Sequence, residues 1–195
     1  MSLFESPATI SLVNSDKSVD TISVYWLGVP YETGVGETLI KYYTDLKRVK
    51  QMINLGKLDR LGKYLEPAPV TRRFGFDPLE DPVYAKMDVG EKYEWMNDSE
   101  NYTKAYHRDR GDELRIKHYN SIKDYEQNVF NDFEMRFNYI FKPIPKADYP
   151  EYKWYIREYI NVPTDSYIHD IFHEMPKPNP VEESELTQDF INNWY

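Results

Sequence analysis

Two pairs of β-branched and aromatic runs constrain the fold of this 195-residue chain more than any other feature. Residues 8–13 (ATISLV) and 21–26 (TISVYW) flank a string of turn-forming residues, which is the pattern of a β-hairpin. Residues 137–141 (FNYIF) and 153–160 (KWYIREYI) alternate in the same way on either side of a loop that contains prolines. The sequence therefore predicts two β-hairpins that lie far apart along the chain.

Helical patterns lie between and after these runs. Residues 46–55 (LKRVKQMINL) place their apolar side chains on one face, with Thr44 or Asp45 as the N-cap and Gly56 after the last turn. Further helices are predicted at 37–43, 118–129, 165–175 and 181–195. The combination predicts an α+β fold, in which two β-hairpins form a small antiparallel sheet, several short helices pack on it, and an acidic helix ends the chain.

We expect one α+β domain over residues 1–175. Within it, residues 64–102 contain four prolines and little periodicity, which predicts an irregular excursion from the domain. Residues 176–180 (PKPNP) are typical of a semi-rigid linker. Residues 176–195 are therefore predicted to be a proline linker followed by a short acidic helix.

Composition narrows the classes of function. The chain has no cysteine, which excludes disulfides, thiolate nucleophiles and cysteine-ligated metals. Its net charge is −9, and after residue 110 it has nine Lys and Arg against 16 Asp and Glu, so direct binding to nucleic acid or anionic lipid is disfavoured. The sequence contains no apolar run of membrane-spanning length and no signal-peptide pattern. We expect a cytoplasmic protein that requires no cofactor.

The segment AYHRDRG, residues 105–111, concentrates groups that could do chemistry. In a catalytic site, His107 would act as general base, Asp109 would orient it, and Arg108 or Arg110 would bind a phosphate. The segment is predicted to be a strand, which places His107 and Asp109 on one face and both arginines on the other. The alternative is a strand end whose charges pair with neighbouring strands.

Two other patterns suggest weaker sites. The Gly28–Gly36 loop precedes a helix, as phosphate-binding loops do, but it lacks the spacing of the known glycine motifs, so a close-packed turn is the alternative. His169 and His173 are four residues apart on a predicted helix, a spacing that can hold one metal ion. Without a third ligand in the sequence, the alternative is an ordinary helix face.

Aromatic residues and the acidic end of the chain indicate a binding surface. The 18 tyrosines suit protein recognition, because tyrosine offers a large contact area and a hydroxyl, although packing in strands and in the core is the more common role of such rings. Leu186, Phe190 and Trp194 recur every four residues in the C-terminal helix. They could insert into a groove of a partner or fold back on their own domain, and the sequence leaves both alternatives open.

An ordered series of motifs resembles a family of uncharacterised small proteins of phages and prophages. The matching pieces are Trp26 with Gly28, the GVG of residues 34–36, KRVKQMINLGKLDRLG (47–62), AYHRDRGDE (105–113) and KWYIRE (153–158). Relatives often carry a Tyr-Cys-His-Trp-Asp-Gly run, whereas residues 23–28 here read SVYWLG and lack its cysteine, histidine and aspartate. The resemblance implies a phage origin, and hence the cytoplasm of a host cell, but it implies no activity.

Two functions follow as hypotheses. The first is a phage-type interaction protein that binds and inhibits a host factor, such as a defence nuclease, through an acidic, tyrosine-rich surface that imitates nucleic-acid charge. The second is a small phosphoester- or nucleotide-binding protein or enzyme that uses the 105–111 strand and the Gly28–Gly36 loop. The second hypothesis requires the strand and the loop to share one pocket.

Overall fold

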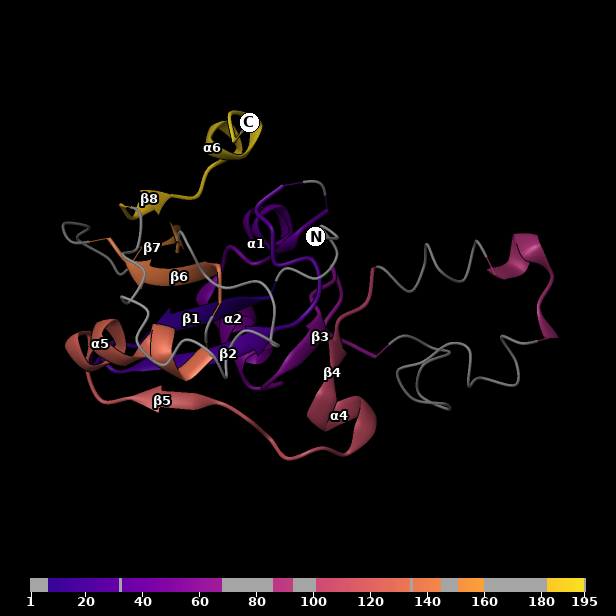
Figure 1. Ribbon diagram of the computed structural model, residues 1–195, viewed down its shortest axis with the longest axis horizontal. Coiled ribbons are helices and arrows are strands. Elements are labelled where there is room, and N and C mark those ends of the chain that lie inside the picture. The colour runs from indigo at the N-terminus through magenta and orange to yellow at the C-terminus, as the bar shows by residue number, and fades with distance from the viewer. Residues whose placement is uncertain are drawn as a thin grey trace, which may run out of the picture.

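The computed structural model describes residues 7–31, 33–67, 86–92, 101–133, 135–144, 151–159 and 182–194. They form an α+β fold built on one eight-stranded sheet, with strand order β4-β3-β2-β1-β6-β7-β8 and β5 beside β2 (Figure 1). The strands are β1 Ala8–Val13, β2 Val19–Val24, β3 Leu58–Arg60, β4 Lys104–Ala105, β5 Lys117–Tyr119, β6 Phe137–Pro143, β7 Tyr152–Glu158 and β8 Ser184–Glu185. The main helices are α1 Val35–Tyr42, α2 Leu46–Ile53, α4 Tyr106–Arg110, α5 Ile122–Phe133 and α6 Gln188–Asn192.

Both predicted hairpins are confirmed, as β1–β2 and β6–β7. The sheet, however, is larger than predicted, and it is mixed rather than antiparallel. β1 pairs in parallel with β6, in a register that runs from Ala8 opposite Phe137 to Leu12 opposite Phe141. This pairing joins the two hairpins edge to edge, and hairpin patterns in the sequence contain no signal for it because the two strands are distant along the chain.

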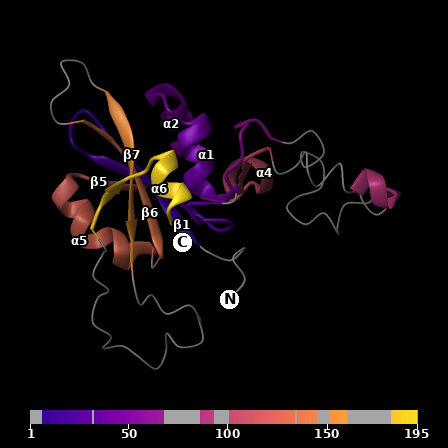
Figure 2. The ribbon, with the colours of Figure 1, turned by 90° about the horizontal axis from the view of Figure 1, so that it is seen from above.

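β1 is buried along its whole length because both faces of the sheet are covered. Ala8, Ile10 and Leu12 belong to the larger core, which also contains the apolar residues of α1 and α2. The alternate residues Thr9 and Ser11 are also fully buried. Ser11 lies on the opposite face, where the Tyr125 hydroxyl of α5 donates to Ser11 Oγ at 3.0 Å. Figure 2 shows α5 across the sheet from α1 and α2.

The Gly28–Gly36 loop passes close to its own chain, as the turn alternative predicted. A Cβ atom on Gly34 would lie 2.2 Å from the Val29 carbonyl oxygen, and one on Gly36 would lie 2.7 Å from Pro30 Cα. The sheet holds the loop in place, because the buried Tyr139 hydroxyl donates to the Gly28 carbonyl at 2.8 Å. Both glycines are therefore required by close packing.

Three predicted helices agree only partly with the structure. The acidic helix predicted over 181–195 is confined to α6, because Ser184 and Glu185 pair with β7 as strand β8. The helix predicted over 46–55 is α2, which ends at Ile53. α2 begins as expected, with Asp45 Oδ1 accepting the Arg48 N–H at 2.9 Å. The helix predicted over 118–129, with Asn120 or Ser121 as its N-cap, begins after Ser121, whose hydroxyl accepts the Asp124 N–H at 3.1 Å. His118 lies instead in β5, an additional strand that pairs with β2. The helix predicted at 165–175, the 176–180 linker and most of the 64–102 excursion lie outside the described residues.

The C-terminal segment folds back on its own domain, which settles the alternative that the sequence left open. The Leu186 N–H donates to the Trp154 carbonyl at 2.9 Å, and Leu186 and Ile191 are both buried in the larger core. Trp194 packs edge-on against Phe137, with ring centroids 5.9 Å apart. α6 lies beside α1 over the sheet (Figure 2).

We predict that Gly34→Ala lowers the free energy of unfolding by about 1–3 kcal/mol, because the added methyl group overlaps two carbonyl oxygens. Urea unfolding measures the change. Gly111→Asn is the control: Gly111 has φ of 77°, a Cβ atom added there would meet nothing within 4 Å, and Asn tolerates this backbone. Equal losses in the two variants would contradict the packing explanation.

Candidate functional site

The AYHRDRG segment is a short helix, so the predicted 105–111 strand is wrong beyond Ala105. α4 spans Tyr106–Arg110 and ends at Gly111, which adopts the left-handed conformation with φ of 77°. The side chain of Asp109 accepts the backbone N–H of Ala105 at 2.8 Å, which stabilises the start of the turn. Strand alternation therefore does not apply to these residues.

Arg108 and Asp109 are engaged in holding the backbone together. The Arg108 guanidinium donates to the Leu65 and Thr103 carbonyls and forms an ion pair with Asp109 at 2.6 Å. These contacts connect the segment after β3 to the one before β4. Because its donors face carbonyls and its own neighbour, Arg108 serves as a structural clamp and is not directed at an open pocket.

His107 and Arg110 lie on the surface. His107 Nδ1 is 2.7 Å from the Asp112 carbonyl, and the side chain is exposed. Arg110 lies over the Tyr106 ring and 3.6 Å from the Asp112 carboxylate. The structure thus brings no catalytic set of His107, Asp109 and an arginine into one pocket.

Backbone N–H groups of the Gly28–Gly36 loop form hydrogen bonds within the loop itself. The N–H groups of Gly34, Val35 and Gly36 donate to the carbonyls of Tyr31, Leu27 and Val29 respectively. A phosphate cradle needs such N–H groups to point at the ligand. The start of α1 therefore offers no phosphate site of the predicted kind.

The predicted metal pair, His169 and His173, lies outside the described residues. Within the described part of the chain, no group of three or more His, Asp or Glu side chains is placed to hold a metal ion.

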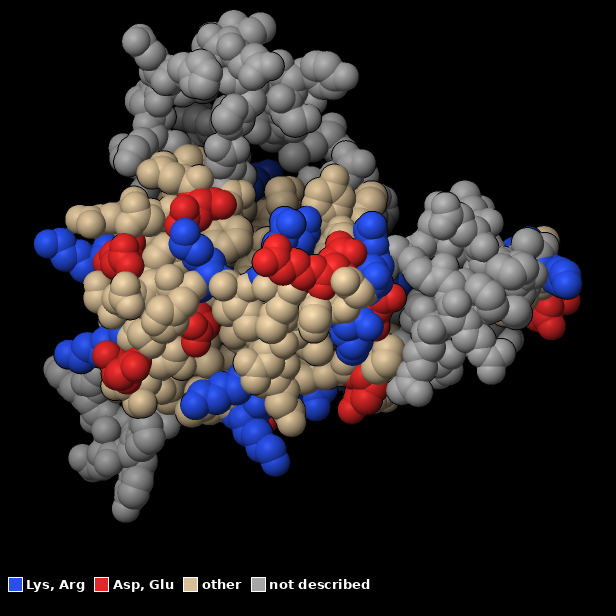
Figure 3. All heavy atoms as spheres, turned by 90° about the horizontal axis from the view of Figure 1, so that it is seen from below, with Lys and Arg blue, Asp and Glu red and all other residues tan. Residues whose placement is uncertain are grey.

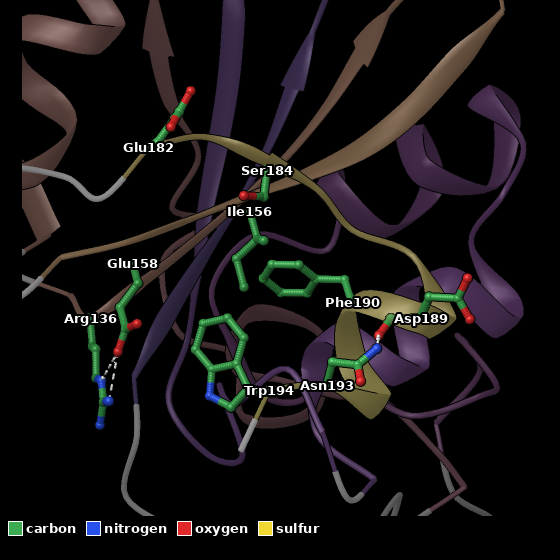
Figure 4. A pocket seen from close by; sticks show the side chains of 9 residues that line it. All are labelled: Arg136, Ile156, Glu158, Glu182, Ser184, Asp189, Phe190, Asn193 and Trp194. Carbon is green, nitrogen blue, oxygen red and sulfur yellow. Dashed lines mark hydrogen bonds and ion pairs between the residues drawn. The ribbon is translucent and has the colours of Figure 1, made fainter.

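A pocket lies where the C-terminal segment meets the sheet, and we call it the C-terminal pocket (Figure 4). It has a volume of about 700 Å³, within the range of ligand sites. Its lining residues are Arg136, Ile156, Glu158, Glu182, Ser184, Asp189, Phe190, Asn193 and Trp194. They come from β7, from the residue before β6 and from the C-terminal segment, which are distant in sequence.

The floor of the C-terminal pocket is apolar and aromatic. Ile156 is buried, and the half-buried rings of Phe190 and Trp194 lie with centroids 5.0 Å apart. Figure 4 shows these three side chains converging at the centre of the pocket. The sequence had indicated Leu186, Phe190 and Trp194 as partner-binding residues. Phe190 and Trp194 line this pocket, whereas Leu186 is buried in the larger core.

The rim of the C-terminal pocket is predominantly acidic. Glu158 forms an ion pair with Arg136 at 2.6 Å. Glu182 and Asp189 are exposed at the edges, and neither forms an ion pair with another described residue. The lining thus carries three carboxylates and one guanidinium, so it favours a cationic group. Sequence reasoning missed Arg136 and Glu158, since only strand pairing brings them beside α6.

Elsewhere the surface charges are mixed. On the face in Figure 3, Asp and Glu side chains are interspersed with Lys and Arg. Many carboxylates have cationic partners, as in the pairs Glu37–Lys41, Asp132–Lys117, Glu183–Arg157 and Glu185–Lys153. The face in Figure 3 therefore shows no continuous acidic stripe.

Asp59 and Tyr106 form a polar pair beside α4. The Tyr106 hydroxyl donates to Asp59 Oδ1 at 3.2 Å. Burial raises the pKa of the Asp59 carboxyl above its usual value, and burial together with the Asp59 charge raises the pKa of Tyr106 to about 12. Hydrogen-bonded pairs with shifted pKa values occur both at active sites and in purely structural networks.

No family model, curated protein or solved structure matches the chain. Among the described residues, no helix is both long enough and apolar enough to cross a membrane. The resemblance to phage proteins therefore stays a prediction.

We predict that Arg108→Gln lowers the free energy of unfolding by about 1–3 kcal/mol, because it leaves carbonyl and carboxylate acceptors without a charged donor. His107→Ala should change it by less than about 0.5 kcal/mol, since the side chain is exposed. Chemical denaturation of both variants tests the structural role of the segment. A large loss in His107→Ala alone would contradict it.

The Asp59 carboxyl gives a prediction for pH. Its folded-state pKa lies above the unfolded value, so its contribution to stability is full below pH 3.8 and is lost as the pH rises through the folded pKa. The Asp59→Asn variant keeps an oxygen that accepts the Tyr106 hydroxyl, and its amide does not ionise, so the stability that the wild type loses on ionisation of Asp59 is not lost. We therefore expect the variant to gain stability over the wild type as the pH rises from 3.8 to 7, as measured by thermal unfolding across that range.

Proposed function

We propose that this protein is a binding protein that engages another protein through the C-terminal pocket and, in keeping with the phage resemblance, inhibits a host factor. The observation that carries the proposal is the pocket itself, whose aromatic floor has carboxylates around its rim. Aromatic side chains dominate the energetics of protein interfaces when they are buried against a partner.

The chemistry of the C-terminal pocket indicates the group that it accepts. A cationic side chain with an apolar stem, from lysine or arginine, can lay its methylenes on Phe190 and Trp194 and direct its charge to Glu182 or Asp189. We therefore propose that the partner presents a basic residue within an apolar segment. The acidic composition of the chain assists the approach of such a partner.

Preorganisation favours binding at this pocket. The backbone hydrogen bond from Leu186 to Trp154, the β7–β8 pairing and the burial of Ile191 fix the C-terminal segment before any partner arrives. A site whose side chains are already held in place loses less conformational entropy on binding. The proposal departs here from the tyrosine-rich surface that the composition suggested, because the described lining of this pocket has Phe190 and Trp194 as its aromatic residues and no tyrosine.

The phosphoester enzyme hypothesis has less support. It needs His107 and an arginine of the 105–111 segment to share a pocket with the glycine loop, whereas Arg108 is clamped to backbone carbonyls and the loop N–H groups are bonded internally.

The test is affinity capture from bacterial lysate with the wild type and three variants, quantified by mass spectrometry. We expect Trp194→Ala to weaken capture of the partner by about 30-fold, as for an interface residue worth about 2 kcal/mol. Asp189→Lys should weaken it by about fivefold, and rising salt should weaken the wild type further. Glu113→Lys makes the same charge change at an exposed position outside the pocket and should leave capture unchanged.

Circular dichroism of each variant confirms that the fold is retained. A partner captured equally by the wild type, Trp194→Ala and Asp189→Lys would refute the proposed site. Loss of capture in Glu113→Lys as well would mean that general charge, and not the pocket, attracts the partner.

A further inference from the structure

The described sheet ends at β8, beside the C-terminal pocket. β8 is the last strand in the strand order, and no described strand lies beyond it. Figure 1 shows β8 at the upper edge of the sheet, next to the segment that leads into α6. Two lining residues of the pocket come from this edge, Ser184 of β8 and Glu182 just before it. The edge and the pocket are therefore parts of one surface.

Strand pairing directs the backbone of Glu185 away from the sheet. The Leu186 N–H donates to the Trp154 carbonyl at 2.9 Å, and the register places Ser184 opposite Ile156. In an antiparallel pair, residues that exchange hydrogen bonds alternate with residues that do not. Glu185 lies between Ser184 and Leu186, so its N–H and carbonyl point to the open side of β8. No described turn, loop or cap forms a hydrogen bond with them.

The two faces of this edge have different neighbours. Ser184 and Ile156 are opposite each other in the register, so their side chains lie on the same face, at the C-terminal pocket (Figure 4). The Glu185 side chain lies on the other face, where it pairs with Lys153 at 2.9 Å. A strand added beside β8 would therefore place alternate side chains at the pocket.

The edge is extended before any partner binds. Leu186 is buried in the larger core, and Thr187, the N-cap of α6, has φ of −121° and ψ of 168°. The Phe190 N–H donates to Thr187 Oγ1 at 3.1 Å, which fixes the point where the extended stretch ends and α6 begins. The edge thus needs little further ordering to accept another strand, which lowers the entropic cost of binding.

Charge decides which kind of strand fits this edge. Glu182 and Asp189 are exposed beside the pocket. A second copy of this chain that paired through the same edge would bring a second Glu182 and a second Asp189 to this surface, and like charges oppose such pairing. A segment with a basic side chain would meet opposite charge instead. The edge therefore fits a different protein with a basic segment better than it fits another copy of itself.

We infer that the partner of the C-terminal pocket binds as an extended segment that pairs with β8 and lengthens the sheet by one strand. The inference rests on the function proposed above and adds the conformation of the bound segment to it. Backbone hydrogen bonds to Glu185 contribute affinity, as in other cases of strand addition. A basic side chain opposite Ser184, with apolar side chains at the alternate positions on either side, enters the pocket. Polar side chains between them lie on the face of Glu185 and Lys153.

Fluorescence anisotropy of a fluorescein-labelled peptide, Thr-Val-Thr-Lys-Thr-Val-Thr, tests the inference on the full chain. In a strand, its valines and lysine share one face and its threonines the other. Glu185→Pro removes the outward N–H and leaves the bonds between β7 and β8 in place, because proline is tolerated where a strand N–H faces away from the sheet. We expect about tenfold weaker binding. Glu185→Gln loses the same charge and keeps the N–H, so its affinity should stay within about twofold of the wild type.

Two modified peptides give a second readout that needs no change in the protein. One has N-methyl groups on its two interior threonines that flank the lysine, and the other has them on its two valines. Only alternate N–H groups of an added strand face its neighbour, so one peptide should bind about tenfold more weakly than the other. If Glu185→Pro fails to fold, the two peptides alone decide.

Equal binding of the two modified peptides, or equal losses in Glu185→Pro and Glu185→Gln, would overturn the inference, as would no binding of the unmodified peptide at about 1 mM. Trp194→Ala separates this inference from the proposed function. Weaker binding in Trp194→Ala with unchanged binding in Glu185→Pro would keep the pocket and reject strand addition. The reverse pattern would keep strand addition and reject the pocket.

Discussion

The parallel pairing of β1 with β6 is the contact on which the rest of the structure depends. Each hairpin alone would have unpaired strand edges and two uncovered faces. An isolated hairpin is at best marginally stable in water. The pairing of residues 8–12 with residues 137–141 makes one sheet from the two hairpins and turns β1 into a central strand that is buried on both faces. The helices can then cover both sides of a continuous surface.

The two faces of that sheet are chemically different. The face under α1, α2 and α6 is aliphatic and aromatic, whereas the face under α5 contains a buried polar network. In that network Ser11 bonds to Thr21 at 3.0 Å, and the Tyr125 hydroxyl contacts both Ser11 and Asn138. Such a network can form in only one strand register, because a shift of one residue would send its side chains to the other face. It therefore specifies how β1, β2 and β6 align.

The position of the proposed site follows from this sheet. The C-terminal pocket exists because β8 extends the sheet beyond β7 and α6 then lies on the apolar face, which brings Phe190 and Trp194 beside Ile156. β3 pairs in parallel with β2 at Val24, and this pairing directs the segment after β3 past α1. The AYHRDRG segment has a structural role, because Arg108 and Asp109 form hydrogen bonds that hold the backbone near β4.

Local patterns alone determined a large part of this protein. The β1–β2 and β6–β7 hairpins were predicted from the sequence. A cap of α2 at Thr44 or Asp45 and, as one of two alternatives, the close-packed glycine turn were also predicted, because each depends on neighbouring residues. The segment from Ala105 to Gly111 was misread as a strand, since its helix depends on a carboxylate cap and on Arg108 contacts with Leu65 and Thr103. Only the tertiary structure decided that the sheet is mixed and that the C-terminal segment docks on the domain. It also decided that Arg136 and Glu158 lie in one pocket with residues of α6. These features join residues that are distant in sequence, and the free energy that selects them comes from long-range pairing and shared burial, which no local pattern records.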